Sequence, residues 1–410
     1  MKKNYIYALY IGTTKLVALR GLIQDDGELI VERFVKVPAT GFTKGVVTNI
    51  EKASLQLKNA VQQLGEDFDY TKVDFHIILS NNYLRNYVCN SSVYFGELMR
   101  PVIHTDILRV IQQTKSVATV PLDEFIIDES PQSFIVNDLS GIIDPLELEA
   151  RRLGVNLMLF TVNGTVIRNI MKSLEHIDII TDLFVPKAIS SSFAVLRQEE
   201  RRDGIVMIDI GGYVTDVIYV KNTIMHYYKT VGVGGEDISL FLAQNLNVTQ
   251  VEARRLKERF GSAMLLSSFE DEIIPVVDIF GKTRLSLNKK RLYDQIFIAT
   301  KNLLEEIKPI VDTVRKDVGI VSGIVLTGGG ASLEGILEMS QDIFGAPVRL
   351  GISRKINGPK EVITSPQYTA VAGVLGYIVD KVRRDEQRFS NKWLLTKKIM
   401  QAKEWIQEYF

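Results

Sequence analysis

Two segments of the chain share one hydrophobic pattern, in which an apolar run meets a turn with glycine and a second apolar run follows. The first is YALYIGTTKLVALRG, residues 7–21, and the second is GIVMIDIGGYVTDVIYV, residues 204–220. Apolar runs of this length around a glycine predict two strands joined by a tight turn. The segments lie roughly 200 residues apart, and a repeat of this kind predicts two related lobes that face each other.

Each predicted hairpin is followed by a helix signal. GFTKGVVTNI, residues 41–50, introduces an amphipathic helix expected over residues 51–64, and VGVGGEDISLFLAQNL, residues 231–246, places glycines before a second helix. A third turn, Gly328 to Gly330, ends an apolar strand and precedes a helix expected to start near Ser332. Strands that alternate with helices predict an α/β fold.

Composition and charge narrow the class of protein. The chain has 410 residues, of which 46% are hydrophobic, so it can bury a large core in two or more globular units. Lysine plus arginine equals aspartate plus glutamate, 49 each, so no overall field attracts nucleic acid. The one cysteine excludes an intramolecular disulfide, and the four histidines lack metal-ligand spacing. No apolar run reaches the roughly 18 to 20 residues of a membrane-spanning helix, which predicts a cytoplasmic protein.

The ordered set of two Gly/Thr hairpins and a later Gly-Gly-Gly turn resembles the nucleotide clamp of the actin, sugar-kinase and heat-shock ATPase superfamily. Within it, the chain resembles the FtsA family of bacterial cell division proteins over essentially its whole length. The segments that carry this likeness include GFTKGVVTNI, GIIDPLELEARRLGVNLMLFT, VGVGGEDISLFLAQNLNVTQVEARRLKERFG and LTGGGASLEGI. The resemblance implies an actin-like, two-lobed α/β fold built on a ribonuclease H-like repeat, with a nucleotide cleft, an extra subdomain and a C-terminal amphipathic helix.

The same resemblance divides the chain into subdomains. It implies subdomain 1A at residues 1–81 and 162–195, the inserted subdomain 1C at 82–161, subdomain 2A at 196–234 and 317–380, subdomain 2B at 235–316, a linker at 381–391 and the terminal helix at 392–410. Residues 184–196 and 368–378 match the two connecting helices. In the second, Ala370, Ala372, Gly373 and Gly376 are small enough for close packing between the lobes.

The glycine turns and their polar neighbours are the candidate nucleotide site. Backbone N–H groups of the turns can donate hydrogen bonds to phosphate oxygens, and Lys15 can add a charge-assisted contact. Glu252 and Arg255, at i and i+3 on one helix, share a face and are expected to hold ribose and base, the alternative being a solvated charge pair. The full set expected to bind ATP or ADP is Gly12, Thr13, Thr14, Lys15, Gly211, Gly212, Gly234, Gly235, Glu252, Arg255, Gly328, Gly329 and Gly330.

Hydrolysis requires acids that the sequence lacks. Tyr10 stands where relatives carry an acid, Val185 where many carry glutamate, and Tyr213 where the usual turn has glycine. A bulky Tyr213 is expected to narrow the phosphate turn. Asp209 and Asp216 remain, and Asp209 is the residue expected to orient Mg²⁺ through water. No catalytic residue is therefore assigned, and we expect ATP binding with weak or absent turnover.

The C-terminal segment, residues 392–410, has the pattern of an amphipathic helix. One face gathers apolar side chains and the other carries lysines and acids, which favours a membrane interface over docking on the protein's own core or on a partner helix. The tryptophans belong to this segment and suit the headgroup region. The membrane-facing residues are expected to be Leu394, Leu395, Ile399, Trp405, Ile406, Tyr409 and Phe410.

The family resemblance also implies a function. The protein is expected to polymerise on the cytoplasmic face of the cell membrane, to tether FtsZ filaments of the Z ring at the division septum, and to help assemble the divisome. The FtsZ C-terminal peptide is expected on residues 235–316, which carry Lys289, Lys290, Arg291 and Lys301, and other divisome proteins on subdomain 1C. The alternatives are a PilM-like component of a type IV pilus or secretion apparatus and a small-molecule kinase on the same fold.

Overall fold

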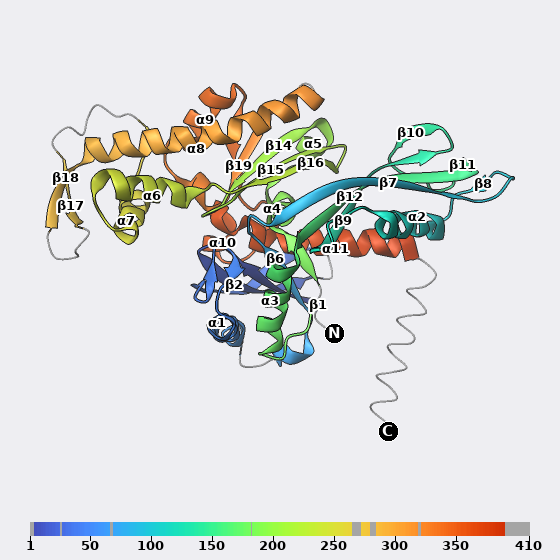
Figure 1. The fold of residues 1–410 in the computed structure, drawn as a ribbon, viewed down its shortest axis with the longest axis horizontal. Coiled ribbons are helices and arrows are strands. Elements are labelled where there is room, and N and C mark those ends of the chain that lie inside the picture. Colours follow the sequence, from blue (N-terminus) through green and yellow to red (C-terminus); the bar gives the residue numbers. More distant parts are fainter. Residues whose placement is uncertain are drawn as a thin grey trace. The chain divides into compact units, whose positions relative to one another are not determined.

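The computed structural model describes residues 4–24, 27–65, 69–181, 183–264, 272–278, 284–318 and 321–389 (Figure 1). It divides into two compact units. Among the described residues, the larger unit lies within 4–85, 123–128 and 161–375, and the smaller lies within 86–122, 129–160 and 376–389. The mixed α/β composition agrees with the predicted fold class.

The first lobe of the larger unit is a six-stranded sheet. The strands are β13 (Phe184–Pro186), β6 (Phe75–Leu79), β1 (Asn4–Ile11), β2 (Lys15–Ile23), β3 (Leu29–Pro38) and β21 (Ile356–Asn357), in that order across the sheet. β1 and β2 are antiparallel and form the predicted first hairpin, while β6 is parallel to β1. Helices α1 (Ile50–Gln62) and α3 (Gly164–Glu175) pack on each other and share one core with this sheet. α1 confirms the helix expected over residues 51–64.

The second lobe repeats this plan. Its sheet has the order β16 (Ile224–Val231), β15 (Thr215–Lys221), β14 (Ile205–Ile210), β19 (Ile324–Thr327) and β20 (Val348–Leu350). β14 and β15 form the second hairpin, and β19 is parallel to β14. Its core is shared by α6 (Gly235–Leu246), α7 (Gln250–Phe260), α8 (Lys289–Val318), α9 (Ile336–Phe344) and the hairpin of β17 (Ile273–Val277) and β18 (Arg284–Asn288). Both predicted glycine hairpins are therefore present, one in each sheet.

Two helices connect these sheets, as the small-residue segments indicate. α4 (Lys187–Val195) follows β13, and α11 (Thr369–Phe389) closes the described chain. The two helices lie close together at Gly373, where an added Cβ would clash with the carbonyl oxygen of Ser190. Any larger residue there would force the helices apart, which explains the need for glycine at this position.

The smaller unit has its own sheet and core. The sheet order is β10 (Leu139–Ile142), β9 (Glu124–Val136), β12 (Arg152–Asn163) and β7 (Leu84–Tyr94), with a two-stranded pair of β8 (Arg100–Pro101) and β11 (Glu149–Ala150). Helix α2 (His104–Val117) contributes Ile107, Val110 and Ile111 to the core of this unit. Arg100 and Asp106 form an ion pair of 2.7 Å at the start of α2.

The end of α11 lies within the segment that the sequence predicts as a linker. α11 runs to Phe389, so residues 381–389 of the segment expected to be a linker are helical. The sequence KVRRDEQRF contains neither glycine nor proline and is rich in arginine, lysine and glutamine, which are good helix formers. The predicted amphipathic helix, residues 392–410, lies outside the described residues. Of the helices that are described, none is both long and apolar enough to cross a bilayer.

Candidate functional site

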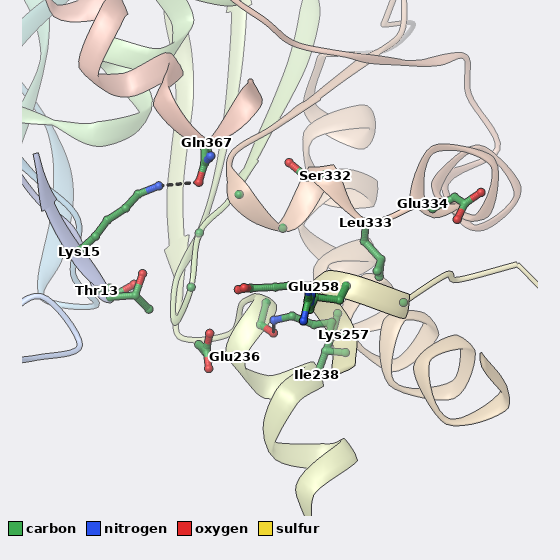
Figure 2. A pocket seen from close by; sticks show the side chains of 18 of the residues that line it. Thr13, Lys15, Glu236, Ile238, Lys257, Glu258, Ser332, Leu333, Glu334 and Gln367 are labelled. Carbon is green, nitrogen blue, oxygen red and sulfur yellow. Dashed lines mark hydrogen bonds between the residues drawn. The ribbon is translucent and has the colours of Figure 1, made fainter. Parts of the chain in front are cut away.

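A cavity of about 460 Å³ lies in the larger unit, where the two glycine hairpins approach each other (Figure 2). Both hairpin turns and the 3₁₀ segment η3 (Gly329–Ser332) contribute to its wall, together with the end of α7. The lining residues are Tyr10, Thr13, Thr14, Lys15, Gly211, Gly212, Gly235, Glu236, Ile238, Lys257, Glu258, Arg259, Gly261, Gly329, Gly330, Ser332, Leu333, Glu334 and Gln367.

The two hairpin turns have the same backbone construction. In the first, the N–H of Gly12 donates to the carbonyl of Lys15 at 3.0 Å, and in the second the N–H of Gly211 donates to the carbonyl of Val214 at 2.8 Å. The turns also touch, because the backbone N–H of Tyr213 donates to Oγ1 of Thr13 at 3.3 Å. The cavity is thus bounded by two matching turns that are hydrogen-bonded to each other.

Lys15 brings a positive charge to this wall. Its Nζ donates to Oε1 of Gln367 at 2.8 Å (Figure 2). The same Nζ lies 4.3 Å from the centre of the Tyr368 ring. Burial, with a contribution from Lys36, lowers the pKa of the Lys15 ammonium to about 8. A bound anion would raise the pKa of Lys15 again, since a negative charge nearby favours the protonated form.

This geometry predicts a pH-dependent affinity for a phosphate ligand. Binding raises the lowered pKa of Lys15, so the complex takes up a proton above pH 8 and affinity falls as pH rises. We expect the dissociation constant to increase about tenfold per pH unit until the pH approaches the ordinary lysine pKa of about 10.4. Calorimetric titration with ATP at several pH values measures it. A Lys15→Arg variant keeps its charge over this pH range, so its dissociation constant should not rise with pH in this way. If the dissociation constant of the variant rises equally, Lys15 does not cause the pH dependence.

The opposite wall comes from α7 and the elements around it. Lys257 donates from Nζ to Oγ of Ser239 at 2.8 Å, and burial lowers the pKa of its ammonium. The next residue, Glu258, also lines the cavity, as do the apolar side chains of Ile238 and Leu333 (Figure 2). This wall therefore combines a carboxylate, an ammonium group and an apolar surface.

Most of the predicted glycine-turn residues lie at the cavity. Thr13, Thr14, Lys15, Gly211, Gly212, Gly235, Gly329 and Gly330 line it. Gly12, Gly234 and Gly328 do not line it but belong to the same turns. Gly328 has a φ of +85°, and a Cβ there would lie 2.4 Å from Oδ1 of Asp209, so this position accepts only glycine.

Glu252 and Arg255, by contrast, do not line the cavity. They form an ion pair of 2.6 Å, and Glu252 accepts a hydrogen bond from the N–H of Val277 while Arg255 donates to the carbonyl of Pro275. Both side chains thus fix strand β17 against α7. Lys257 and Glu258, which the sequence analysis did not select, occupy the part of α7 that faces the cavity.

The expected narrowing of the second turn by Tyr213 is not seen. Its backbone does not adopt a positive φ, so the turn needs no glycine there. The phenol accepts a hydrogen bond from Nε2 of Gln250 at 3.3 Å, and Nζ of Lys44 lies 5.1 Å from the ring centre. These contacts hold the side chain away from the cavity wall.

Asp209, which was predicted to orient Mg²⁺ through water, is also absent from the cavity wall. It is 2% exposed and is ion-paired with Lys187, the first residue of α4. Lys187 is not among the residues that the sequence predicted for the site. The sequence signal for its role is weak. It is a single lysine in the segment FVPKAISSSFAVL, whose other residues are apolar or small, and such a lysine is ordinarily interpreted as exposed.

Two lobes with matching hairpins, connected by α4 and α11 and enclosing a cavity at the hairpin turns, define an actin-like protein. Comparison with known proteins narrows the class. A family model described as "Cell division protein FtsA" matches residues 206–373, and one described as "SHS2 domain inserted in FTSA" matches residues 82–161. The chain belongs to the cell division protein FtsA family.

Full-length relatives agree with this assignment. The cell division protein FtsA of Pseudomonas aeruginosa is 27% identical over 383 residues, covering 92% of this chain and 89% of its own length. That of Borreliella burgdorferi is 26% identical, covering 97% of this chain and 95% of its own. Among solved structures, a chain of the PilM-PilN type IV pilus biogenesis complex has the same fold, with a TM-score of 0.65, 13% identity, and coverage of 90% of this chain and 97% of that chain.

Proposed function

We propose that this protein is an ATP-binding adaptor of cell division, which polymerises on the cytoplasmic face of the membrane and tethers FtsZ filaments at the septum. The observation that carries the proposal is FtsA-family membership of a chain whose two glycine hairpins enclose a cavity. Nucleotide acts in this proposal as a structural ligand that ties the two hairpins together.

The cavity suits an adenine nucleotide in one orientation. The phosphates lie at the hairpin turns, where Thr13, Thr14 and Lys15 face Gly211 and Gly212. The ribose and base lie toward α7 and η3. There the carboxylate of Glu258 can accept hydrogen bonds from ribose hydroxyls, and Ile238 and Leu333 offer apolar contact to the base.

The same cavity does not favour phosphoryl transfer. A kinase needs a carboxylate that orients an attacking hydroxyl, and Tyr10 stands at the position where the sequence analysis expects an acid. Glu236 also lines the cavity, but its Oε2 accepts from NH2 of Arg254 at 2.8 Å. The proposed role is therefore binding with little or no turnover, and the small-molecule kinase is the weaker reading.

Membrane attachment is assigned to residues 392–410 on their sequence pattern. One amphipathic helix is a marginal anchor, since each basic residue near an anionic surface contributes only about 1 kcal/mol. A polymer presents many such helices together, and the later ones bind at high effective concentration. Polymerisation and membrane attachment are thus coupled in this proposal.

The proposed docking region for the FtsZ C-terminal peptide is the start of α8 and the neighbouring hairpin. Lys290 and Arg291 are exposed there, next to Ile273, which is 63% exposed and pairs with Asn288 across the β17–β18 ladder. Basic and apolar groups side by side suit a peptide that is partly acidic and partly hydrophobic. Of the other predicted basic residues, Lys289 is paired with Glu272 at 2.6 Å and Lys301 with Glu305 at 3.7 Å.

Charge reversal at this region should weaken peptide binding. We expect Lys290→Glu together with Arg291→Glu to reduce the affinity for the FtsZ C-terminal peptide of the same organism by about tenfold or more, because two attractive contacts become repulsive. Fluorescence anisotropy of the labelled peptide against the full chain measures it.

A matched control is a double reversal in the other lobe. Lys52 and Lys58 are exposed on α1, so Lys52→Glu with Lys58→Glu changes the net charge equally and should leave peptide affinity unchanged. Equal weakening of peptide binding in both double variants would mean that net charge, and not this region, determines the affinity. Absence of peptide binding at high micromolar protein, with capture of a pilus-protein peptide, would support the PilM-like alternative instead.

A further inference from the structure

Asp209 on β14 and Asp216 on β15 share a single buried lysine. Nζ of Lys187 lies 3.1 Å from Oδ1 of Asp209 and 3.0 Å from Oδ2 of Asp216, and the three side chains are 2%, 3% and 1% exposed. Burial alone would lower the pKa of Lys187, but the two carboxylates raise it well above the usual lysine range. The two carboxylates therefore favour the charged form of the ammonium group, which lies against β14 and β15.

The remaining oxygens of both acids are also engaged. Oδ2 of Asp209 accepts from Oγ of Ser191 at 2.5 Å. Oδ1 of Asp216 accepts from the hydroxyl of Tyr228 at 3.1 Å and from Oγ1 of Thr230 at 2.6 Å. Mg²⁺ demands nearly ideal octahedral oxygen coordination and keeps most of its waters, so it could reach these carboxylates only by expelling Lys187.

The other acids on the cavity wall are Glu236, Glu258 and Glu334. Glu236 is paired with Arg254 and is 4% exposed. In the part of the chain that the structure describes, no group of three or more histidine, cysteine, aspartate or glutamate side chains is arranged to hold a metal ion. Tyr10 replaces an expected acid by a phenol whose pKa is raised by burial. The residues present therefore do not fit the Mg²⁺ that the sequence predicted at Asp209.

We infer that the ammonium group of Lys187 takes the place of Mg²⁺ in this protein, so that the cavity binds ATP without a divalent cation. The position of Lys187 supports this role. A Cβ on Gly211 would lie 3.2 Å from Nζ, so the charge sits directly behind the turn whose Gly211 and Gly212 line the cavity. From there it offsets the two carboxylates that would otherwise repel phosphates. Lys15 supplies a second cation from the first hairpin.

The inference rests on the proposed nucleotide function, and one titration distinguishes a failure of the inference from a failure of that function. Calorimetry of the full chain with ATP is carried out once with excess EDTA and once with Mg²⁺. We expect the two dissociation constants to agree within about threefold, a free-energy difference of about 0.7 kcal/mol. Binding that is about tenfold or more tighter with Mg²⁺ would overturn the inference and leave the proposed function standing. No binding under either condition would overturn both.

A variant tests whether Lys187 is the cause. Lys187→Gln frees the two carboxylates, and its affinity for ATP should rise by about tenfold or more when Mg²⁺ is added. Lys257→Gln is the matched control, because this lysine lines the cavity and should weaken binding equally with and without Mg²⁺. A folded Lys187→Gln variant that binds ATP equally under both conditions would contradict the assignment. If this variant does not fold, the wild-type comparison decides alone.

Discussion

Replacing Lys187 with methionine is expected to lower the free energy of unfolding by about 3–5 kcal/mol, because it leaves two buried carboxylates without their cation. Both Asp209 and Asp216 lie within 3.1 Å of the Lys187 ammonium, and their side chains are at most 3% exposed. Water cannot solvate the charges that the substitution uncovers. Urea unfolding followed by circular dichroism measures the effect. Tryptophan fluorescence is unsuitable, since both tryptophans, Trp393 and Trp405, lie in the terminal segment.

Two further variants separate this charge effect from the loss of packing. Adding Asp209→Asn and Asp216→Asn to Lys187→Met removes the uncompensated charges, so the triple variant should recover most of the lost stability. Lys257→Met removes a half-buried lysine whose Nζ donates to Ser239 and Gly235, and should cost clearly less. A loss below about 1 kcal/mol in Lys187→Met would mean that the two acids are solvated or protonated without this lysine.

The hairpins were predictable because their signal is local. A strand, a glycine turn and a second strand are encoded within about fifteen consecutive residues, and both hairpins formed where the pattern placed them. The same holds for α1, whose observed span, Ile50–Gln62, agrees with the amphipathic helix predicted at residues 51–64. The turn residues that line the cavity follow directly, since their place in the hairpin fixes where they point.

The residues of α7 were harder to predict because their orientation depends on packing. Glu252 and Arg255 share a face as i and i+3, but the sequence alone does not say which neighbour that face meets. In the structure it meets β17, and the last turn of the helix, with Lys257 and Glu258, faces the cavity instead. The i, i+3 spacing identifies residues that are neighbours on a helix. It does not predict which way the helix is rotated, because tertiary contacts determine that.

Lys187 shows a second limit of sequence interpretation. Its partners lie 22 and 29 residues further along the chain, on two different strands, and only the folded sheet brings them to α4. Lysine is almost never fully buried unless it is paired, so a pattern-based prediction places it at the surface. The pairing of Asp209, for which the sequence predicted a magnesium role, could not be predicted for the same reason, because its partner Lys187 is not local in the sequence.

Deleting residues 392–410 is expected to abolish recruitment of FtsZ to membranes, the largest effect proposed for this protein. The deletion removes the residues predicted to form the apolar face of an amphipathic helix, and with them the area that would enter the interface; these residues are Leu394, Leu395, Ile399, Trp405, Ile406, Tyr409 and Phe410. It leaves the described lobes and the proposed FtsZ-binding region intact. A histidine tag in place of the deleted segment, on vesicles with nickel-chelating lipid, should restore recruitment if the segment serves only as an anchor.

The most direct test of the adaptor function is vesicle flotation with both proteins present. Anionic vesicles are mixed with FtsZ filaments of the same organism and either the full chain or the deletion variant, and the floating fraction is assayed for FtsZ. The account predicts FtsZ in that fraction with the full chain and its absence with the deletion variant. Full chain that floats with the vesicles while FtsZ stays at the bottom of the gradient would contradict the proposed function.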